Sequence, residues 1–171
     1  DKYGYDAYDL YAYPRVDGFT ILPTLLHPKS RGTVSLSSSD PKDAPIIQPN
    51  FLEEKEDLDQ LVKGGKLVFK LMDDDALRKH TLRDRLPFDR NSEDSLIEHI
   101  KKTLETVYHP VGTCKMGVDS MAVVDPMLKV HGISNLRVVD ASIMPLIVSG
   151  NTNAPVYMIA EKAADMILNN F

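Results

Sequence analysis

Residues 58–72 read LDQLVKGGKLVFKLM, which is the clearest structural pattern in the chain. The apolar residues at positions 58, 61, 62, 68, 69 and 72 share one stripe of a helix with 3.6 residues per turn. Gly64 and Gly65 in the middle of this helix each cost about 1 kcal/mol relative to alanine, so we predict that another segment packs closely against them. The acidic run at 73–75 is expected to end the helix.

Two more helices are predicted further along the chain. The first begins at Ser92, whose hydroxyl can cap the helix, and carries Leu96, Ile97, Ile100 and Leu104 on its buried face. The second runs from about 154 to 168, with Asn153 as the N-cap and Pro155 in the first turn. We expect its inner face to consist of Val156, Ile159, Ala160, Ala163 and Ile167.

The segments with β-type composition are short. A hairpin with one solvated face is predicted from two β-type segments, 19–27 and 33–37, which a turn at 29–32 joins. Residues 38–49 carry three prolines among polar residues, which indicates a loop with short extended pieces. Three further short β-type runs are predicted at 123–124, 128–130 and 136–139.

Composition excludes several classes of protein. The chain has 171 residues, of which 43% are apolar and 26% charged, as is typical of one globular domain or two small ones. Its net charge is −5 and the basic residues are scattered, which argues against nucleic acid as the main partner. No apolar run approaches the ~20 residues that a membrane span needs. The single cysteine, Cys114, cannot form a disulfide within the chain.

Charged residues become rare after position 106, and two polar clusters stand out there, at 108–117 and at 149–155. Pro110 restricts the backbone of His109, which can aim the imidazole, and a histidine can act as a general base at neutral pH. A structural hydrogen-bonding role for His109 remains the alternative. Cys114 as a nucleophile would need a basic partner and an oxyanion site, and a buried inert thiol is the competing interpretation.

Two other kinds of site are disfavoured by the sequence. The glycines at 112 and 117 have the spacing of a phosphate-binding loop, but Val118 and Asp119 replace the required Lys and Ser/Thr. The five histidines never fall at i, i+3 or i, i+4 spacing and there is no cysteine pair, so no metal site is predicted.

The cluster at 149–155 precedes the last predicted helix. Backbone N–H groups at a helix N-terminus carry partial positive charge and can stabilise an anion or a carbonyl oxygen that gains charge. Helix capping alone would explain Asn153, but it explains neither Asn151 nor Gly150.

Four ordered motifs resemble the C-terminal part of the glucose-methanol-choline (GMC) oxidoreductases. They are YHPVGTCKMG at 108–117, AVVDP at 122–126, NLRVVDASIMP at 135–145 and SGNTNAPVYMIAEKAADMI at 149–167. The upstream stretches HPKSRGTVSL and PIIQPNFL are similar to the substrate-domain hairpin of that family and the loop after it. The resemblance covers nearly all of the chain beyond residue 16 and is closest to choline dehydrogenase and invertebrate glucose dehydrogenase-like members.

The resemblance implies FAD-dependent oxidation of a small-molecule alcohol. His109 matches the histidine that takes the hydroxyl proton while hydride passes to flavin N5, and Asn151 matches a residue that hydrogen-bonds the substrate oxygen. The helix that starts at Ala154 would place its positive end near the flavin N1/C2 carbonyl region, where charge arrives. The implied cofactor contacts are Asp140 and Ala141 at the FAD phosphate and ribityl chain and Asn153, Ala154 and Pro155 at the flavin edge.

The chain departs from the family in one respect, because none of its nine glycines forms the G-x-G-x-x-G dinucleotide fingerprint. We therefore expect a C-terminal fragment of α+β class. It would comprise a tail or loop at 1–15, a substrate-domain portion at 16–106 with an antiparallel sheet and packed helices, and a segment at 107–171 that returns a strand and the C-terminal helix to the FAD-binding domain.

Without the missing N-terminal FAD-binding portion, the fragment is expected to be inactive, and apolar surface left uncovered would favour self-association. A non-catalytic binding or structural module that keeps the family's shape is the alternative. The sequence leaves open the identity of the alcohol, the choice between oxygen and a quinone as electron acceptor, and the localisation.

Overall fold

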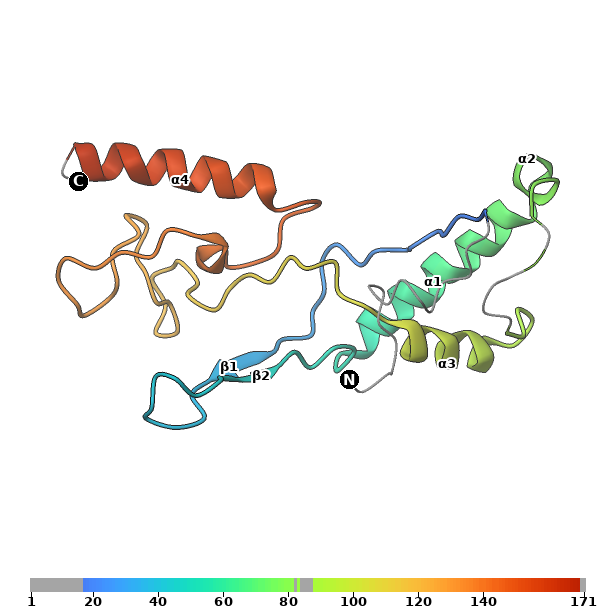
Figure 1. The fold of residues 1–171 in the computed structure, drawn as a ribbon, viewed down its shortest axis with the longest axis horizontal. Helices are drawn as coiled ribbons and strands as arrows, with labels where there is room; N and C mark the ends of the chain where they lie inside the picture. Colours follow the sequence, from blue (N-terminus) through green and yellow to red (C-terminus); the bar gives the residue numbers. More distant parts are fainter. Residues whose placement is uncertain (1–16, 82, 84–87, 170–171) are drawn as a thin grey trace. The chain divides into compact units, whose positions relative to one another are not determined.

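A computed structural model describes residues 17–81, 83 and 88–169 (Figure 1). The predicted tail at 1–15 lies outside these residues. The chain divides into two compact units, one formed by residues 1–30 and 51–106 and the other by residues 31–50 and 107–171. The described residues contain helices and a two-stranded antiparallel sheet, which confirms the predicted α+β class at this level. None of the helices in this part of the chain is both long enough and apolar enough to cross a membrane.

The described residues of the first unit form three helices. Helix α1 spans Lys55–Met72, α2 spans Asp75–Arg78 and α3 spans Glu93–Thr103 (Figure 1). The two longer helices confirm the sequence-based predictions, including the cap of α3, in which the Ser92 hydroxyl accepts a hydrogen bond from the Ser95 N–H. Leu104, which was predicted on the buried face of this helix, follows its last residue instead. Acidic residues in the first turn and basic residues in the last turn of α3 complement its helix dipole.

The two glycines of α1 mark close packing on both sides of the helix. A Cβ atom placed on Gly64 would lie 2.9 Å from Cβ of Pro23, and one placed on Gly65 would lie 3.0 Å from Cδ1 of Leu96. Leu96 belongs to α3 and is 3% exposed. The prediction of a closely packed segment at these glycines is confirmed, because the chain before α1 and helix α3 both approach here.

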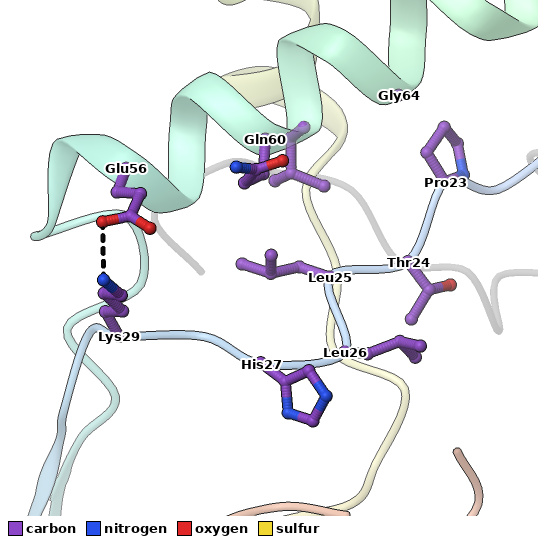
Figure 2. Close-up of a pocket in the computed structure, with 10 residues that line it drawn as sticks. Pro23, Thr24, Leu25, Leu26, His27, Lys29, Glu56, Gln60 and Gly64 are labelled. Carbon is purple, nitrogen blue, oxygen red and sulfur yellow. Dashed lines mark hydrogen bonds and ion pairs between the residues drawn. The ribbon is translucent and has the colours of Figure 1, made fainter. Parts of the chain in front are cut away.

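A buried carboxylate fastens the extended chain at 19–30 to the start of α1. Asp57, 2% exposed, accepts hydrogen bonds from the backbone N–H groups of Lys29 and Ser30, each at 2.8 Å. The Lys29 ammonium forms an exposed ion pair of 2.7 Å with Glu56, which raises the pKa of Lys29 (Figure 2). Figure 2 also shows Pro23 beside Gly64 and His27 pointing away from the helix, around an open groove of about 410 Å³.

The hairpin forms with a different partner from the one predicted. Strand β1, Thr33–Ser35, pairs antiparallel with β2, Ile46–Gln48, and Val34 lies opposite Ile47. The predicted pairing of 19–27 with 33–37 is wrong. Residues 19–27 contain no strand, because Pro23 packs on α1 and Asp57 holds the backbone that follows. The extended pieces expected within 38–49 are confirmed, and one of them supplies the partner strand.

Gly32 directly precedes β1 and lies close to the end of β2, and its replacement by alanine is expected to disrupt the hairpin. A Cβ atom at this position would lie 2.3 Å from the Gln48 carbonyl oxygen and 2.8 Å from Cα of Pro49, so backbone would have to move. Overpacking of this kind costs about 1–3 kcal/mol. Urea unfolding should therefore show Gly32→Ala to be less stable than Gly18→Ala, because nothing lies within 4 Å of a Cβ at Gly18. Equal stabilities would contradict the prediction.

An aromatic cluster connects α1 with α3 in the first unit. The rings of Phe88 and His99 stack with centroids 4.1 Å apart, and Phe69 lies 5.7 Å from Phe88. Arg90 adds a cation–π contact, with its guanidinium carbon 5.5 Å from the Phe69 centroid. Burial lowers the pKa of His99 below its ordinary value of 6.5, and the nearby Lys102 lowers it further.

This lowered pKa predicts that His99 destabilises the fold at acid pH. Between the folded-state pKa and 6.5 the unfolded chain binds a proton at His99 that the folded chain does not, so stability is lost as the pH falls below 6.5. Denaturant unfolding at pH 7.5 and at pH 5 should show a smaller pH-dependent loss for His99→Phe than for the unsubstituted protein. Identical losses would contradict this assignment.

Residues 107–171 supply the core of the second unit. Isolated bridges join Met116 to Val124, Val124 to Val130 and Lys129 to Arg137, so the predicted short β-type runs form bridges and not full strands. The 3₁₀ helix η1, Ala141–Ile143, and helix α4, Asn153–Leu168, cover them. The buried cluster consists of Val124, Leu128, Ile143, Met144, Ile159, Ala163 and Met166.

Helix α4 ends at Leu168 as predicted, but its N-cap and its core-facing residues differ from the prediction. Its N-cap is Thr152 and Asn153 is its first residue, so the predicted Asn153 cap is wrong. Met166, and not Ile167, faces the core, since residues 159, 163 and 166 follow one another along one stripe at i, i+4 and i+7. Ile167, a step further around the helix, is 54% exposed, and Ala160 is also exposed.

Candidate functional site

The segment that carries His109 has an unusual backbone. Tyr108 has φ = 62° and Gly112 has φ = 91°, both in the left-handed region. His109 itself is half-buried, and Pro110 after it favours an extended conformation at His109. In the described part of the chain, no hydrogen bond occupies the imidazole of His109, which leaves its ring nitrogens available for a ligand.

Backbone hydrogen bonds hold this segment against η1. The N–H groups of Gly112 and Cys114 both donate to the carbonyl oxygen of Ser142, each at 3.1 Å, and Met116 donates to Ile143 at 2.8 Å. Figure 1 shows the yellow chain after α3 passing alongside the orange turn of η1. The carbonyl of Ser142 therefore anchors the His109 segment. We did not predict this role, because every residue has a backbone carbonyl and the residue type does not indicate which one accepts these hydrogen bonds.

Asp140 and Ala141, the two predicted contacts to the phosphate and ribityl chain, begin η1. The Asp140 carboxylate accepts a hydrogen bond of 2.7 Å from the Ser142 N–H and so caps this turn. Ala141 is half-buried and packs against the core cluster. Both residues thus lie within a few residues of the carbonyl that anchors the His109 segment.

The remaining predicted residues lie at the start of α4. Gly150 has φ = 128° and Asn151 is exposed, whereas Thr152 is buried and its carbonyl accepts a bond from Val156. No side chain in the described chain caps α4, so the backbone N–H groups of Asn153 and Ala154 have neither a side-chain nor an intrahelical partner. Pro155 has no N–H to satisfy. This helix end can donate hydrogen bonds to an external oxygen.

The turn after the His109 segment is stabilised by an ion pair. Lys115 Nζ lies 2.9 Å and 3.0 Å from the two carboxylate oxygens of Asp119, and this hydrogen bonding lowers the pKa of Asp119. Asp119 also accepts a bond from the Met121 N–H. The spacing of Lys115 and Asp119 was a signal for this turn that our sequence interpretation did not use.

All seven predicted site residues lie in the second unit. Hydrogen bonds link the His109 segment to η1, and the core cluster links η1 to α4. His109 and Asn151 are not hydrogen-bonded to each other in the described chain, and their joint action stays a prediction. The groove of Figure 2 contains none of the seven residues. Among the described residues, no group of three or more His, Cys, Asp or Glu side chains could hold a metal ion.

Comparison with known proteins identifies the family. The family model described as GMC oxidoreductase, for the C-terminal part of these proteins, matches residues 28–160. The chain belongs to the GMC oxidoreductase family. The match includes His109, Asn151 and every predicted cofactor contact, and the resemblance drawn from the sequence motifs is confirmed.

Individual relatives agree with this assignment. The chain is 47% identical to an alcohol dehydrogenase [acceptor] of Pseudomonas putida, over 88% of this chain and 28% of the relative. It is 45% identical to an oxygen-dependent choline dehydrogenase of Pseudomonas savastanoi pv. phaseolicola, over 81% of this chain and 24% of the relative. Its structure matches an FAD-dependent oxidoreductase from Chaetomium thermophilum with a TM-score of 0.79 and 28% identity, over 85% of this chain and 26% of that one. The chain thus spans about a quarter of the length of these relatives.

Proposed function

We propose that this chain forms the C-terminal part of an FAD-dependent oxidoreductase that oxidises a CH–OH donor. The observation that carries the proposal is the family match over residues 28–160, which contains both His109 and Asn151. Two relatives, an alcohol dehydrogenase and a choline dehydrogenase, are named for activities of the same reaction class. We further propose that residues 16–106 belong to the substrate domain and residues 107–171 return to the FAD-binding domain.

His109 is proposed as the general base of the reaction. Its half-buried imidazole has ring nitrogens that no described residue occupies, so one of them can accept the proton of a substrate hydroxyl. The anchoring of its segment on Ser142 limits the reorganisation needed when substrate binds. Asn151, exposed at the loop before α4, is proposed to donate a side-chain hydrogen bond to the same substrate oxygen.

The start of α4 fits the cofactor that this function requires. FAD, when bound, supplies the acceptor for the hydride that leaves the carbinol carbon. Asn153 and Ala154 present backbone N–H groups that no side chain in the described chain caps, and the helix dipole adds positive potential there. The small side chain of Ala154 and the missing N–H of Pro155 leave this helix end open for a planar ring edge.

We propose that the missing part of the protein also covers the outer face of α4. Tyr157, Met158 and Leu168 are each more than 60% exposed, although they are large apolar side chains. Such an apolar surface marks an interaction site in soluble proteins. A chain that lacked this cover would associate with itself through α4.

The decisive experiment uses the full-length polypeptide that contains this chain. It is purified, its absorption spectrum is recorded for bound flavin, and reduction of an electron-accepting dye is measured with a panel of alcohols that includes choline. Bound flavin and alcohol-dependent reduction support the proposal. A folded protein that neither binds flavin nor reduces the dye would identify a non-catalytic module instead.

Alkylation of Cys114 should leave activity unchanged, because the proposed chemistry uses no thiol.

A further inference from the structure

Tyr108 has a backbone conformation that its side chain disfavours. Its φ of 62° lies in the left-handed region, which Asn, Asp and Gly adopt readily and bulky residues rarely do. Only four other non-glycine residues among those described share this feature, and Tyr108 is the one that directly precedes the proposed base, His109. Backbone outliers of this kind persist where the surrounding structure fixes them, and they cluster at functional sites.

The chain on the other side of His109 is fixed as well. Pro110 restricts the backbone of His109 to extended conformations. Gly112, with φ = 91°, donates to the Ser142 carbonyl, which also holds Cys114. The segment from 108 to 112 therefore has a residue with left-handed backbone conformation at each end. With its far end held, the direction of the His109 side chain depends on the backbone angle at Tyr108.

We propose that Tyr108 is a positioning residue, whose left-handed backbone conformation aims the imidazole of His109 at the substrate hydroxyl. This inference rests on the proposed function, because it assumes that His109 acts as the base. The contribution of Tyr108 comes from its backbone and not from its ring. Residues that accept the left-handed conformation can therefore replace it, and β-branched residues cannot.

Two substitutions at position 108, made in the full-length holoenzyme, separate backbone from side chain. Tyr108→Val should lower kcat, expressed per bound flavin, by about 10-fold or more with KM nearly unchanged, because a small misplacement of a catalytic group has effects of this order. Tyr108→Asn should keep kcat within about 3-fold, since asparagine tolerates a positive φ. Equal kcat values for the two variants would overturn the proposal, and so would a loss in Tyr108→Asn that Tyr108→Phe does not show.

A double variant tests whether Tyr108 acts through His109. The kcat of Tyr108→Val/His109→Ala should equal that of His109→Ala alone, because without the imidazole the backbone at position 108 has no catalytic side chain to orient. Additive losses would overturn the proposal. Additive losses differ from failure of the proposed function, because in that case His109→Ala itself would have little effect on kcat.

Asn135 provides the matched control in the same unit. It has φ = 59° and lies in an exposed turn outside the proposed site. Asn135→Val should lower Tm, as any β-branched residue would in this conformation, and should leave kcat per bound flavin unchanged. A fall in kcat equal to that of Tyr108→Val would mean that loss of stability, and not aim, explains both variants.

Discussion

The His109→Ala variant of the full-length protein is expected to lose at least about 100-fold in kcat, the usual contribution of a positioned general base. The imidazole is half-buried, and in the described chain no residue competes for its ring nitrogens. Alanine removes the proton acceptor but leaves the backbone anchors at Gly112 and Cys114 in place. The loss should therefore appear in turnover, with the flavin still bound.

Steady-state dye reduction with a saturating alcohol measures this effect. His80→Ala is the matched control, because His80 is exposed and lies in the other unit of the chain. The control should keep its activity within about 3-fold. The assignment of His109 as the base fails if His109→Ala itself loses less than about 3-fold.

A second large effect is expected for stability at Asp57. Alanine at this position leaves the N–H groups of Lys29 and Ser30 without their carboxylate partner in a buried environment. Hydrogen bonds to a charged group and the desolvation of unpaired donors together predict a loss of about 2–4 kcal/mol in the free energy of unfolding. The affected region should be the extended chain at 19–30 together with the start of α1.

Glu56, the preceding residue, is the control for this prediction. Its ion pair with Lys29 is exposed and screened by solvent, so Glu56→Ala should cost much less stability than Asp57→Ala. Urea unfolding curves of both variants give the comparison, and amide hydrogen exchange at Lys29 and Ser30 should accelerate only in Asp57→Ala. A loss for Glu56→Ala as large as that for Asp57→Ala would show that buried hydrogen bonding is not the cause.

The helices could be predicted from the sequence because their signals are local. The apolar stripe of α1 and the Ser92 cap of α3 each occupy one short window of sequence. The hairpin partner could not be predicted in the same way. The segment at 19–27 has the composition of a strand, but the contact that holds it in place, from Asp57 to Lys29, connects residues 28 positions apart. Tertiary hydrogen bonding overrode local β-propensity here.

The site shows the same division between local and distant signals. His109, Asn151 and the residues at 140–141 and 153–155 could be selected because they stand in motifs that resemble those of a known family. The anchor at Ser142 acts through a carbonyl that every residue possesses. The left-handed conformation of Tyr108 runs against its residue type, so local propensity gives no signal for it. The N-cap of α4 was misassigned by one residue because both Thr152 and Asn153 are good capping residues.

The second unit is assembled from two separate stretches, 31–50 and 107–171. On the ribosome, residues 51–106 must be made between them, which takes roughly 3–11 s at ~5–20 residues per second. During that interval the β1–β2 ribbon exists without the rest of its unit, and an isolated two-stranded hairpin is at best marginally stable in water. The unit that carries the proposed base can therefore fold only late in translation, after the first unit has been synthesised.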